Sequence, residues 1–352
     1  MKGLAVGDLL LPTSKMVHLF SVEGVRETVT EVVETEFKNK DRSDIRRTWR
    51  SVEENGPGAE PPPPDLHLLV EDVDILAVHI CPVSRQTLDR AGRLRIISTA
   101  RGGVENIDVT AATERGIAVL NTPNHNARAV AEYTIGLMLA ETRNIARSHA
   151  AMKDGKWREY YSNTEFIPEL NGSMVGIVGF GQTGRLVARA LGAFDVSVVV
   201  YDPYVPGDEV ERAGCIPVDL ETLLRKSDIV SLHVRLTQET MGMIGERELR
   251  LMKSSAYLIN TARAGLVQLA AFTRALEEKW ISGAAVDVYE SEPVSGSHPL
   301  LCLDNVTCTS HRAGDTRNAY WKAPLIMGAQ VAKLLRGEKP DFIVNPEVLK
   351  GS

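Results

Sequence analysis

A glycine-rich stretch in the middle of the chain restricts the fold more than any other feature of this sequence. An apolar run that begins at Met174 leads into Gly179, Gly181 and Gly184, in the order G-x-G-x-x-G, and the residues that follow favour a helix. Gly179 permits a tight turn, Gly181 lets another molecule come close to the main chain, and Gly184 lets the helix pack closely on the strand. The pattern predicts a strand, a turn and a helix within an open parallel α/β sheet.

The next apolar run ends at Asp202, 18 residues after Gly184. A carboxylate at about this spacing can accept hydrogen bonds from the two ribose hydroxyls of an adenosine, while the amides of Gln182 and Thr183 face the phosphates at the positive end of the helix. The residues after Asp202 are PYVP, without Arg or Lys, so a 2′-phosphate should be repelled. We therefore expect NAD rather than NADP; a glycine turn that binds nothing is the alternative.

Two series of short apolar runs, separated by helical or turn-like stretches, predict two parallel sheets. The first series lies at residues 74–80, 94–100 and 116–122, and the second consists of MVGIVGFG, VSVVVYD, DIVSLHV, AYLINTA, ISGAAVDVY and NVTCTS. Six strands of this kind make a complete doubly wound sheet. A length of 352 residues also favours two domains.

Four other regions complete the expected organisation. A short strand is predicted at residues 15–20, and a polar, helix-favouring region at about 23–54. Prolines and glycines at 54–64 predict an exposed irregular connection inside the first domain. Residues 126–152 predict one long helix whose first half is apolar nearly all round, so a domain boundary or another subunit must cover it. A final amphipathic helix is expected at about 315–335.

Composition excludes several classes of protein. The formal net charge of −6 does not favour a nucleic-acid-binding protein. No stretch of about 18 apolar residues and no cleavage-type ending near the N-terminus is present, so we expect neither a membrane span nor a signal peptide, and a cytoplasmic location. The four cysteines have no metal-binding spacing, so they are expected to be reduced and no metal is expected.

Charged and titratable residues follow several strands of the second series. Arg263 follows AYLINTA, Asp287 and Glu292 lie in AAVDVYESEPV, and His311 lies in CTSHRAG. Each could be structural: an ion-pair partner, a solvated acid or a helix cap. Because open parallel sheets bind ligands at the carboxyl ends of their strands, we expect these side chains to converge. A histidine base, a supporting carboxylate and an arginine fork suit hydride transfer from a 2-hydroxy acid.

At this point the motifs become recognisable. The chain resembles the D-isomer-specific 2-hydroxyacid dehydrogenases, and among them the D-3-phosphoglycerate dehydrogenase branch, in a short form without the C-terminal regulatory domain. The resemblance extends from about residue 94 to residue 345. It rests on GVENIDVTAATERGIAVLNTPNHNARAVAEYTIGLML, MKDGKW, VGIVGFGQTGR, HVRLTQET, INTARAGLV, AAVDVYESEP and SHRAG.

The resemblance implies an NAD-binding Rossmann domain at 124–317, inserted in a discontinuous, flavodoxin-like substrate domain at 1–123 and 318–352, with closure of the two domains around the substrate. It implies that Arg263 binds the substrate carboxylate, that His311 is the general acid/base and that Glu292 supports it. It also implies a homodimer built on the helix after residue 126, and contact of Asp287 with the nicotinamide carboxamide. The implied cofactor-binding residues are Gly179, Gly181, Gln182, Thr183, Gly184, Asp202, Val234, Thr261, Ala262, Asp287, His311 and Gly314.

The sequence STARGGVENID departs from the family pattern. It places Arg101 in the loop whose amides, at Gly102 and Gly103, are implied to bind the substrate carboxylate. A second fixed cation suggests a phosphate or a second carboxylate on the substrate, as in 3-phosphoglycerate; a plain structural arginine is the alternative. Another departure, VHICPVS, puts His79 or its neighbour at a position where many relatives have arginine.

Two other functions use the same fold. NAD-sensing transcriptional corepressors have the same triad and would bind NADH without turnover, but no partner-docking tail is recognisable here. A relative that takes its hydride from formate or phosphite would need a tiny pocket, which Arg101 does not favour. The leading hypothesis is an NAD-dependent oxidoreductase that interconverts a D-2-hydroxy acid and its 2-oxo acid.

Overall fold

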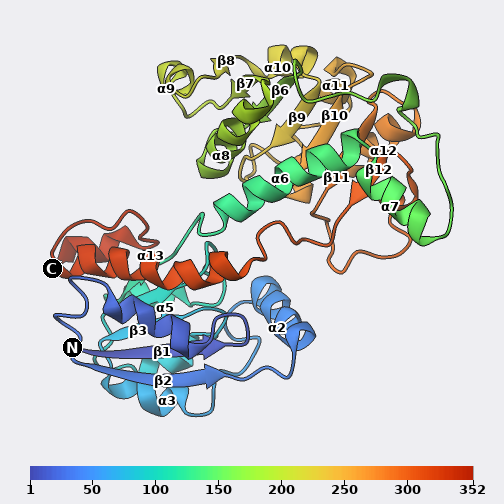
Figure 1. Ribbon diagram of the computed structural model, residues 1–352. Helices are drawn as coiled ribbons and strands as arrows, with labels where there is room; N and C mark the ends of the chain where they lie inside the picture. Colours follow the sequence, from blue (N-terminus) through green and yellow to red (C-terminus); the bar gives the residue numbers. More distant parts are fainter. Residues whose placement is uncertain (352) are drawn as a thin grey trace. The chain divides into compact units, whose positions relative to one another are not determined.

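The chain divides into two compact units in the computed structural model, which describes residues 1–351 (Figure 1). Unit 1 comprises Met1–His125 together with the chain from Thr316 onward. Unit 2 comprises Asn126–Asp315. Within the described residues, no helix combines the length and the apolar character that a membrane crossing requires.

Unit 1 contains a five-stranded parallel sheet in the order β2-β1-β3-β4-β5. Its strands are β1 (Lys2–Asp8), β2 (Glu31–Phe37), β3 (Ile75–Val78), β4 (Ile96–Thr99) and β5 (Ala118–Leu120). Its helices are α1 (Thr13–Met16), α2 (Arg42–Asn55), α3 (Leu66–Leu69), α4 (Arg85–Arg90), α5 (Val109–Glu114) and α13 (Arg317–Leu335).

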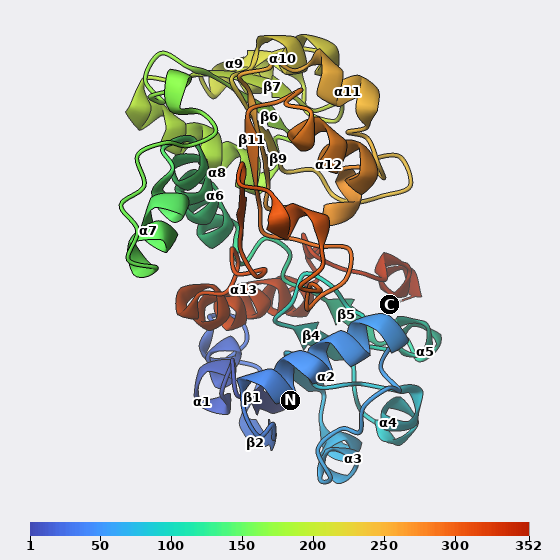
Figure 2. The same ribbon diagram turned by 90° about the vertical axis from the view of Figure 1, so that its right-hand side faces the viewer.

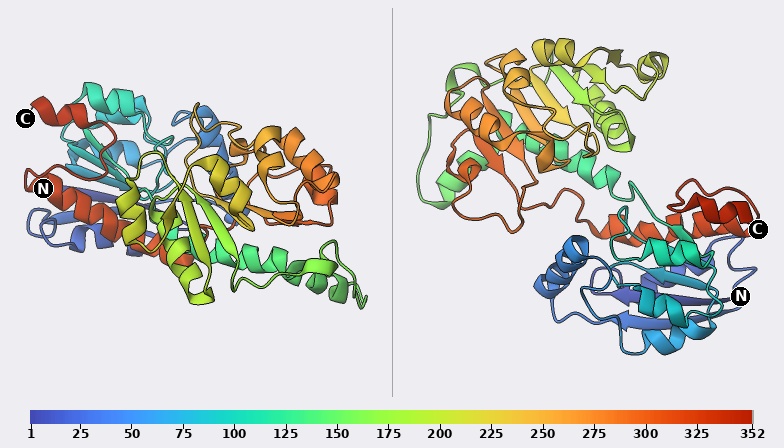
Figure 3. Two further views of the ribbon diagram at one scale, coloured as in Figure 1. Left: turned by 90° about the horizontal axis from the view of Figure 1, so that it is seen from above. Right: turned by 180° about the vertical axis from the view of Figure 1, so that it is seen from behind.

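Both faces of this sheet are buried, which is why its central strands are continuous apolar runs. Leu4 and Leu76 face a core shared with α2, α3, α4 and α5. Ala5 and Ile75 face the opposite core, which α1 and α13 cover. Figure 3 shows α13, in red, along one side of the sheet. The three strands predicted at 74–80, 94–100 and 116–122 are present as β3, β4 and β5.

The N-terminal part of unit 1 differs from the prediction. Residues 15–20 are not a strand; they belong to α1 and to the 3-10 helix η1 (Val17–Ser21). Met16, Leu19 and Phe20 are buried, and their 3,4 spacing is that of a helix face. The strand of this region is instead β1, which lies between β2 and β3 and in which a side chain at Gly3 would collide with the ring of Phe20.

The region predicted as helical at 23–54 is also partly wrong, because it contains β2 before α2. β2 is an edge strand whose polar residues face solvent, so it lacks the apolar content that marked the other strands. Residues 56–64 form no helix or strand, as the prolines and glycines predicted.

Unit 2 contains a seven-stranded parallel sheet in the order β12-β11-β10-β9-β6-β7-β8. The six predicted runs form β6 (Met174–Val178), β7 (Ser197–Tyr201), β9 (Ile229–Leu232), β10 (Tyr257–Asn260), β11 (Gly283–Val286) and β12 (Val306–Cys308). A seventh strand, β8 (Ile216–Pro217), was not predicted because it is only two residues long at the sheet edge.

Helices cover both faces of this sheet, as expected for a doubly wound fold. One side has α6 (Ala127–Thr142), α7 (Ile145–Lys153) and α8 (Gln182–Leu191), and the other has α10 (Leu220–Lys226), α11 (Glu246–Leu251) and α12 (Leu269–Glu277) (Figure 2). α9 (Gly207–Arg212) precedes the edge strand β8. The fold class predicted from the sequence is confirmed by these two parallel sheets.

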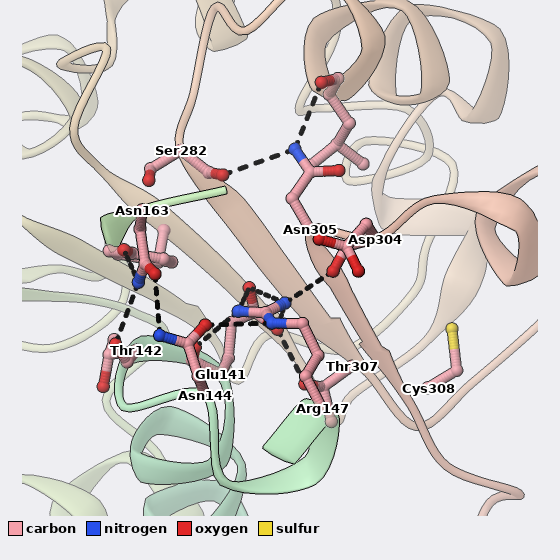
Figure 4. Close-up of polar contacts among 12 residues, drawn as sticks. Glu141, Thr142, Asn144, Arg147, Asn163, Ser282, Asp304, Asn305, Thr307 and Cys308 are labelled. Carbon is pink, nitrogen blue, oxygen red and sulfur yellow. Dashed lines mark hydrogen bonds and ion pairs between the residues drawn. The ribbon is translucent and has the colours of Figure 1, made fainter. Parts of the chain in front are cut away.

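The long helix predicted at 126–152 is two helices, α6 and α7, with a break at Asn144. Asn144 has a left-handed backbone, with φ of 58°, and its side-chain amide donates to Oδ1 of Asn163 at 2.7 Å. After the break, Arg147 turns back to the carboxylate of Glu141, which the hydroxyl of Thr307 also contacts at 2.6 Å (Figure 4). These contacts join residues distant in sequence, so the helical periodicity did not reveal the break.

Candidate active site

The glycine turn of unit 2 has the geometry that its spacing predicts. Gly179 has φ of 98°, and a Cβ there would lie 2.7 Å from the amide nitrogen of Val234. A Cβ at Gly184 would collide with the carbonyl oxygen of Gly179. At Gly181, in contrast, a Cβ would meet no atom within 4 Å. Gly179 and Gly184 are therefore required by internal packing, whereas Gly181 borders open space at the start of α8.

This open space fits a dinucleotide. The first amides of α8, those of Gln182 and Thr183, lie at the positive end of the helix, where phosphates bind favourably. Asp202 lies next to the turn, because its Oδ2 accepts the amide of Phe180 at 2.7 Å and its Oδ1 accepts the amide of Tyr204 at 2.9 Å. Each carboxylate oxygen keeps a lone pair that can accept a ribose hydroxyl.

The residues after β10 form a tight loop around Asn260, which is 3% exposed. Its Oδ1 accepts the amide of Ala262 at 3.0 Å, and its Nδ2 donates to the carbonyl of Arg263 at 2.9 Å. Thr261 hydrogen-bonds through its side chain to Thr134 on α6 at 2.8 Å, so its main chain is what it can offer to a ligand. Asn260 thus holds the loop that carries Arg263, a role that the sequence analysis missed.

Arg263 extends from this loop into solvent. Its backbone is extended, and its Nη1 donates to the carbonyl of Ala262 at 2.7 Å. Among the described residues, this is the one hydrogen bond of its guanidinium, which keeps other N–H donors available. The side chain is therefore a fixed positive charge able to bind an anion in two-point fashion.

His311 and Glu292 form the pair expected from the sequence. His311 Nδ1 lies 2.7 Å from Oε2 of Glu292, and Oε1 of Glu292 accepts the amide of Tyr289 at 3.1 Å. The hydrogen bond to Glu292 raises the pKa of His311, burial opposes this rise, and the positive charge of Arg263 opposes it as well. With Nδ1 engaged, Nε2 is the nitrogen that can exchange a proton with a ligand.

The loop that carries His311 is held by Asp287. This carboxylate is fully buried and accepts the hydroxyl of Thr309 at 2.6 Å, the amide of Arg312 at 2.9 Å and the amide of Ala313 at 2.8 Å. His311 itself has φ of 53°, an uncommon value for a histidine. Asp287 was predicted only as a cofactor contact; its hydrogen bonds also make it a positioning residue for the imidazole.

Gly314 lies near the C-terminal end of unit 2, next to the first residue of that unit, Asn126. A side chain at Gly314 would collide with Nδ2 of Asn126, at the start of the segment that leads into α6.

The four cysteines, Cys81, Cys215, Cys302 and Cys308, are free thiols. Among the described residues, no group of histidines, cysteines and carboxylates could hold a metal ion.

The predicted substrate residues of unit 1 lie in the loop after β4. Asn121 donates to the carbonyl of Gly102 at 2.6 Å, and the carboxylate of Glu105 folds back over Gly103. Arg101 is 3% exposed, and its Nη2 contacts Glu53 at 2.6 Å and Glu105 at 3.4 Å. Its charge is therefore already balanced within unit 1.

Comparison with known proteins identifies the family. Residues 135–313 match the family model described as D-isomer specific 2-hydroxyacid dehydrogenase, NAD binding domain. The chain is 43% identical over 271 residues to a glyoxylate reductase of Thermofilum pendens, covering 76% of this chain and 80% of that protein. It is 40% identical over 279 residues to a D-3-phosphoglycerate dehydrogenase of Methanocaldococcus jannaschii, covering 78% of this chain and 52% of that protein. The chain thus spans about half the length of that second relative.

Solved structures agree with this result. A putative D-3-phosphoglycerate dehydrogenase of Ralstonia solanacearum has a TM-score of 0.66 and 28% identity, over 99% of this chain and 98% of that one. The NAD complex of a D-isomer specific 2-hydroxyacid dehydrogenase from Lactobacillus delbrueckii has a TM-score of 0.76 at 24% identity, over 98% of this chain and all of that one, which shows the shared fold. The chain therefore belongs to the D-isomer specific 2-hydroxyacid dehydrogenase family, and it is an NAD-dependent enzyme of that family.

Proposed function

We propose that this enzyme interconverts a D-2-hydroxy acid and its 2-oxo acid, with His311 as the acid/base. The observation that carries the proposal is the His311–Glu292 pair, 2.7 Å apart, in the electrostatic range of the free guanidinium of Arg263. In oxidation, Nε2 of His311 takes the hydroxyl proton and Glu292 stabilises the imidazolium. In reduction, the same imidazolium returns the proton to the carbonyl oxygen.

Arg263 binds and orients the substrate. Its planar fork holds the carboxylate, and the amides of Gly102 and Gly103 are proposed to bind the same substrate. NAD, when bound, accepts the hydride from the carbon that carries the hydroxyl. The residues proposed to hold NAD are Gly179, Gly181, Gln182, Thr183, Gly184, Asp202, Val234, Thr261, Ala262, Asp287, His311 and Gly314.

A substrate panel tests this proposal. D-2-hydroxy acids with and without phosphate are offered with NAD or NADP, and formation of the reduced cofactor is followed. His311→Asn should lower turnover by about 10²- to 10⁴-fold, the usual contribution of proton transfer, and leave NADH binding nearly unchanged. If NADH binds and no acid on the panel is turned over, the alternative of an NADH-sensing, corepressor-like protein is favoured instead. If NADH binding is lost in the variant, His311 is structural.

A second anion on the substrate, such as the phosphate of 3-phosphoglycerate, is the finer hypothesis. It is supported by Nη1 of Arg101, which is buried without a hydrogen-bond partner. It is opposed by Glu53 and Glu105, which together carry more negative charge than Arg101 carries positive charge. Arg101→Ala should reduce kcat/KM selectively for phosphorylated acids if this hypothesis holds. Equal losses on phosphorylated and unphosphorylated acids count against it.

We also propose a homodimer built on the helical region after residue 126, with α7 and the segment that follows it at the interface. Trp157 is 80% exposed and Tyr160 is 77% exposed, and other apolar side chains of this segment are exposed as well: Ile145, Met152, Phe166 and Ile167. This many exposed apolar side chains within residues 145–167 is unusual for a surface exposed to water and favours an interaction surface. The network of Glu141, Arg147 and Thr307 in Figure 4 holds the segment to β12.

Light scattering after size-exclusion chromatography tests the dimer. Trp157→Asp is expected to shift the protein to a monomer, because a charge would replace an apolar contact. Leu68→Asp, at a side chain that is 72% exposed on α3 of unit 1, is the matched control and should leave the mass unchanged. A monomeric parent protein, or a dimer that tolerates Trp157→Asp, contradicts the proposed surface.

A further inference from the structure

Unit 1 contains a second group of buried polar side chains, in addition to the residues assigned above. Asp8 ends β1, His79 follows β3, and Arg101 follows β4. Since the three strands are neighbours in a parallel sheet, their carboxyl ends meet at one edge. Asp8 and His79 are each 1% exposed, and Arg101 is 3% exposed. Such groups are almost never fully buried unless they are paired.

Asp8 and His79 form a buried pair in which the hydrogen-bond donor and acceptor can be assigned. Nδ1 of His79 lies 2.8 Å from Oδ2 of Asp8, whose Oδ1 accepts the amides of Leu10 and Leu11. Burial by itself would raise the pKa of Asp8, but the imidazole and these amides outweigh burial and lower it. Asp8 is therefore a carboxylate, and Nδ1 of His79 carries the hydrogen. Nε2 of His79 is buried and has no hydrogen-bond partner among the described residues.

Arg101 also has a buried side-chain nitrogen without a hydrogen-bond partner. Its Nη2 is used by Glu53 and Glu105, whereas its Nη1 is buried without a partner among the described residues. Both side chains contact Trp49: the guanidinium stacks on the indole at 4.6 Å, and the imidazole meets it edge-on at 5.6 Å between centroids. Two unpaired polar atoms next to one indole are unusual, because buried polar groups are nearly always hydrogen-bonded.

The chemistry of these atoms indicates what they bind. Nη1 of Arg101 is always a donor, whereas Nε2 of His79 is an acceptor when the imidazole is neutral and a donor when it is charged. A hydroxyl satisfies both atoms in either state, since its oxygen accepts from Nη1 and its hydrogen can be given to Nε2. A carboxylate or phosphate dianion has no hydrogen for a neutral Nε2, and Glu53 and Glu105 would repel it.

We infer that His79 and Arg101 bind an uncharged hydroxyl on the substrate, at carbon 3 or beyond, and so select hydroxylated acids over plain aliphatic ones. This inference rests on the proposed function. Arg101 directly precedes Gly102 and Gly103, whose amides are proposed to bind the carboxylate, and neighbouring Cα atoms are only about 3.8 Å apart. This proximity suits an acid of three or four carbons. Asp8 is a positioning residue, since it orients the imidazole.

Reduction of three 2-oxo acids with NADH tests the inference. Pyruvate and hydroxypyruvate differ by one hydroxyl, and 3-phosphohydroxypyruvate replaces that hydroxyl with a phosphate ester. We expect kcat/KM for hydroxypyruvate to exceed that for pyruvate by about 10- to 100-fold, the range for leaving buried polar groups unpaired. We expect the phosphorylated acid to be a poorer substrate than hydroxypyruvate.

Variants of His79 separate recognition from folding. In His79→Asn, the side-chain amide can keep the hydrogen bond to Asp8 while the group at the Nε2 position is removed, so the preference for hydroxypyruvate should fall to less than about threefold. In His79→Gln, an amide reaches the Nε2 position, so part of the preference should return. His67→Asn is the control, because His67 contacts Thr87 at 3.2 Å elsewhere in unit 1, and it should keep the full preference.

The outcomes distinguish the inference from the function on which it rests. Equal use of pyruvate and hydroxypyruvate by the parent enzyme overturns the inference, and so does an undiminished preference in His79→Asn. A preference for the phosphorylated acid overturns it in favour of the second-anion hypothesis. If circular dichroism shows that His79→Asn does not fold, the test uses the ratio of kcat/KM for hydroxypyruvate to that for pyruvate in the parent enzyme and in His79→Gln. If none of the three acids is reduced but another acid of the panel is turned over, the inference fails and the proposed function stands. If no acid of the panel is turned over while NADH binds, the proposed function itself fails.

Discussion

The replacement Glu292→Gln should shift the pH dependence of the enzyme without removing its cofactor or substrate sites. The Glu292 carboxylate lies 2.7 Å from Nδ1 of His311 and is the largest cause of the raised pKa of that imidazole. A neighbouring opposite charge typically shifts a pKa by about 1 to 3 units. Because the His311 side chain is 48% exposed, water screens the pair, so the effect of the carboxylate is weaker than in a fully buried pair.

The sign of the effect differs between the two directions of the reaction. Reduction needs the imidazolium, so kcat/KM for the 2-oxo acid falls as pH rises through the pKa of His311. Without the carboxylate the pKa of His311 drops, and this loss of activity should occur at lower pH. Oxidation needs the neutral imidazole, so in the variant the oxidation activity should also appear at lower pH. The positive charge of Arg263 remains in the variant and also lowers the pKa of His311.

The assay is the pH profile of kcat/KM in both directions, with NADH affinity measured at each end. Glu290→Gln is the matched control, since Glu290 lies in the same loop and pairs with a different imidazole, that of His298, at 3.2 Å. The control should keep the parent midpoints. Unchanged midpoints in Glu292→Gln, or a uniform loss of activity at every pH, would refute the electrostatic role and leave Glu292 only an orienting one.

Four further replacements test other parts of unit 2. Gly181→Ala should fold normally and weaken NADH binding, because a Cβ at Gly181 meets no other atom of the chain. Gly184→Ala should unfold at a lower temperature, because a Cβ at Gly184 would collide with the main chain of Gly179. Equal melting temperatures of the two variants would contradict this. Asp202→Asn should raise the NADP-to-NAD ratio of kcat/KM by about tenfold as the repelling charge is lost, and an unchanged ratio would contradict the predicted ribose contact. Asp287→Asn should lower the free energy of unfolding in urea by about 1 to 3 kcal/mol and reduce turnover, because an amide group cannot accept all three hydrogen bonds that hold the loop of His311.

The second sheet could be predicted well from the sequence because each of its main strands is buried on both faces. Such strands are apolar at most positions, and this makes them visible as nearly continuous runs. The first unit was harder to predict. β2 is a polar edge strand, and the apolar run of β1 is interrupted by Gly3 and Gly7, which the packing of α1 and η1 against it requires.

The break between α6 and α7 shows a different limit of prediction from the sequence. Local periodicity favoured one continuous helix, but Arg147 reaches back to Glu141 and forward to the carbonyl of Asp304 at 2.8 Å. Contacts that span more than 150 residues leave no periodic signal in the chain. The partners of Arg101 were hidden for the same reason, because Glu53 lies 48 positions upstream.

The types and order of the reactive groups can be read directly from the chain: a glycine turn, an acid after the second strand of the cofactor sheet, and an arginine, a glutamate and a histidine that follow strands. These follow from local rules, since spacing along the chain decides which residues end strands and open helices. Which of these charges remain available to a ligand depends on the three-dimensional fold. Arg263 and Arg101 are the same residue type, yet one guanidinium extends into solvent and the other is buried against two carboxylates. Electrostatic strength depends on distance and burial, and those are set by groups that the fold brings together from distant parts of the chain.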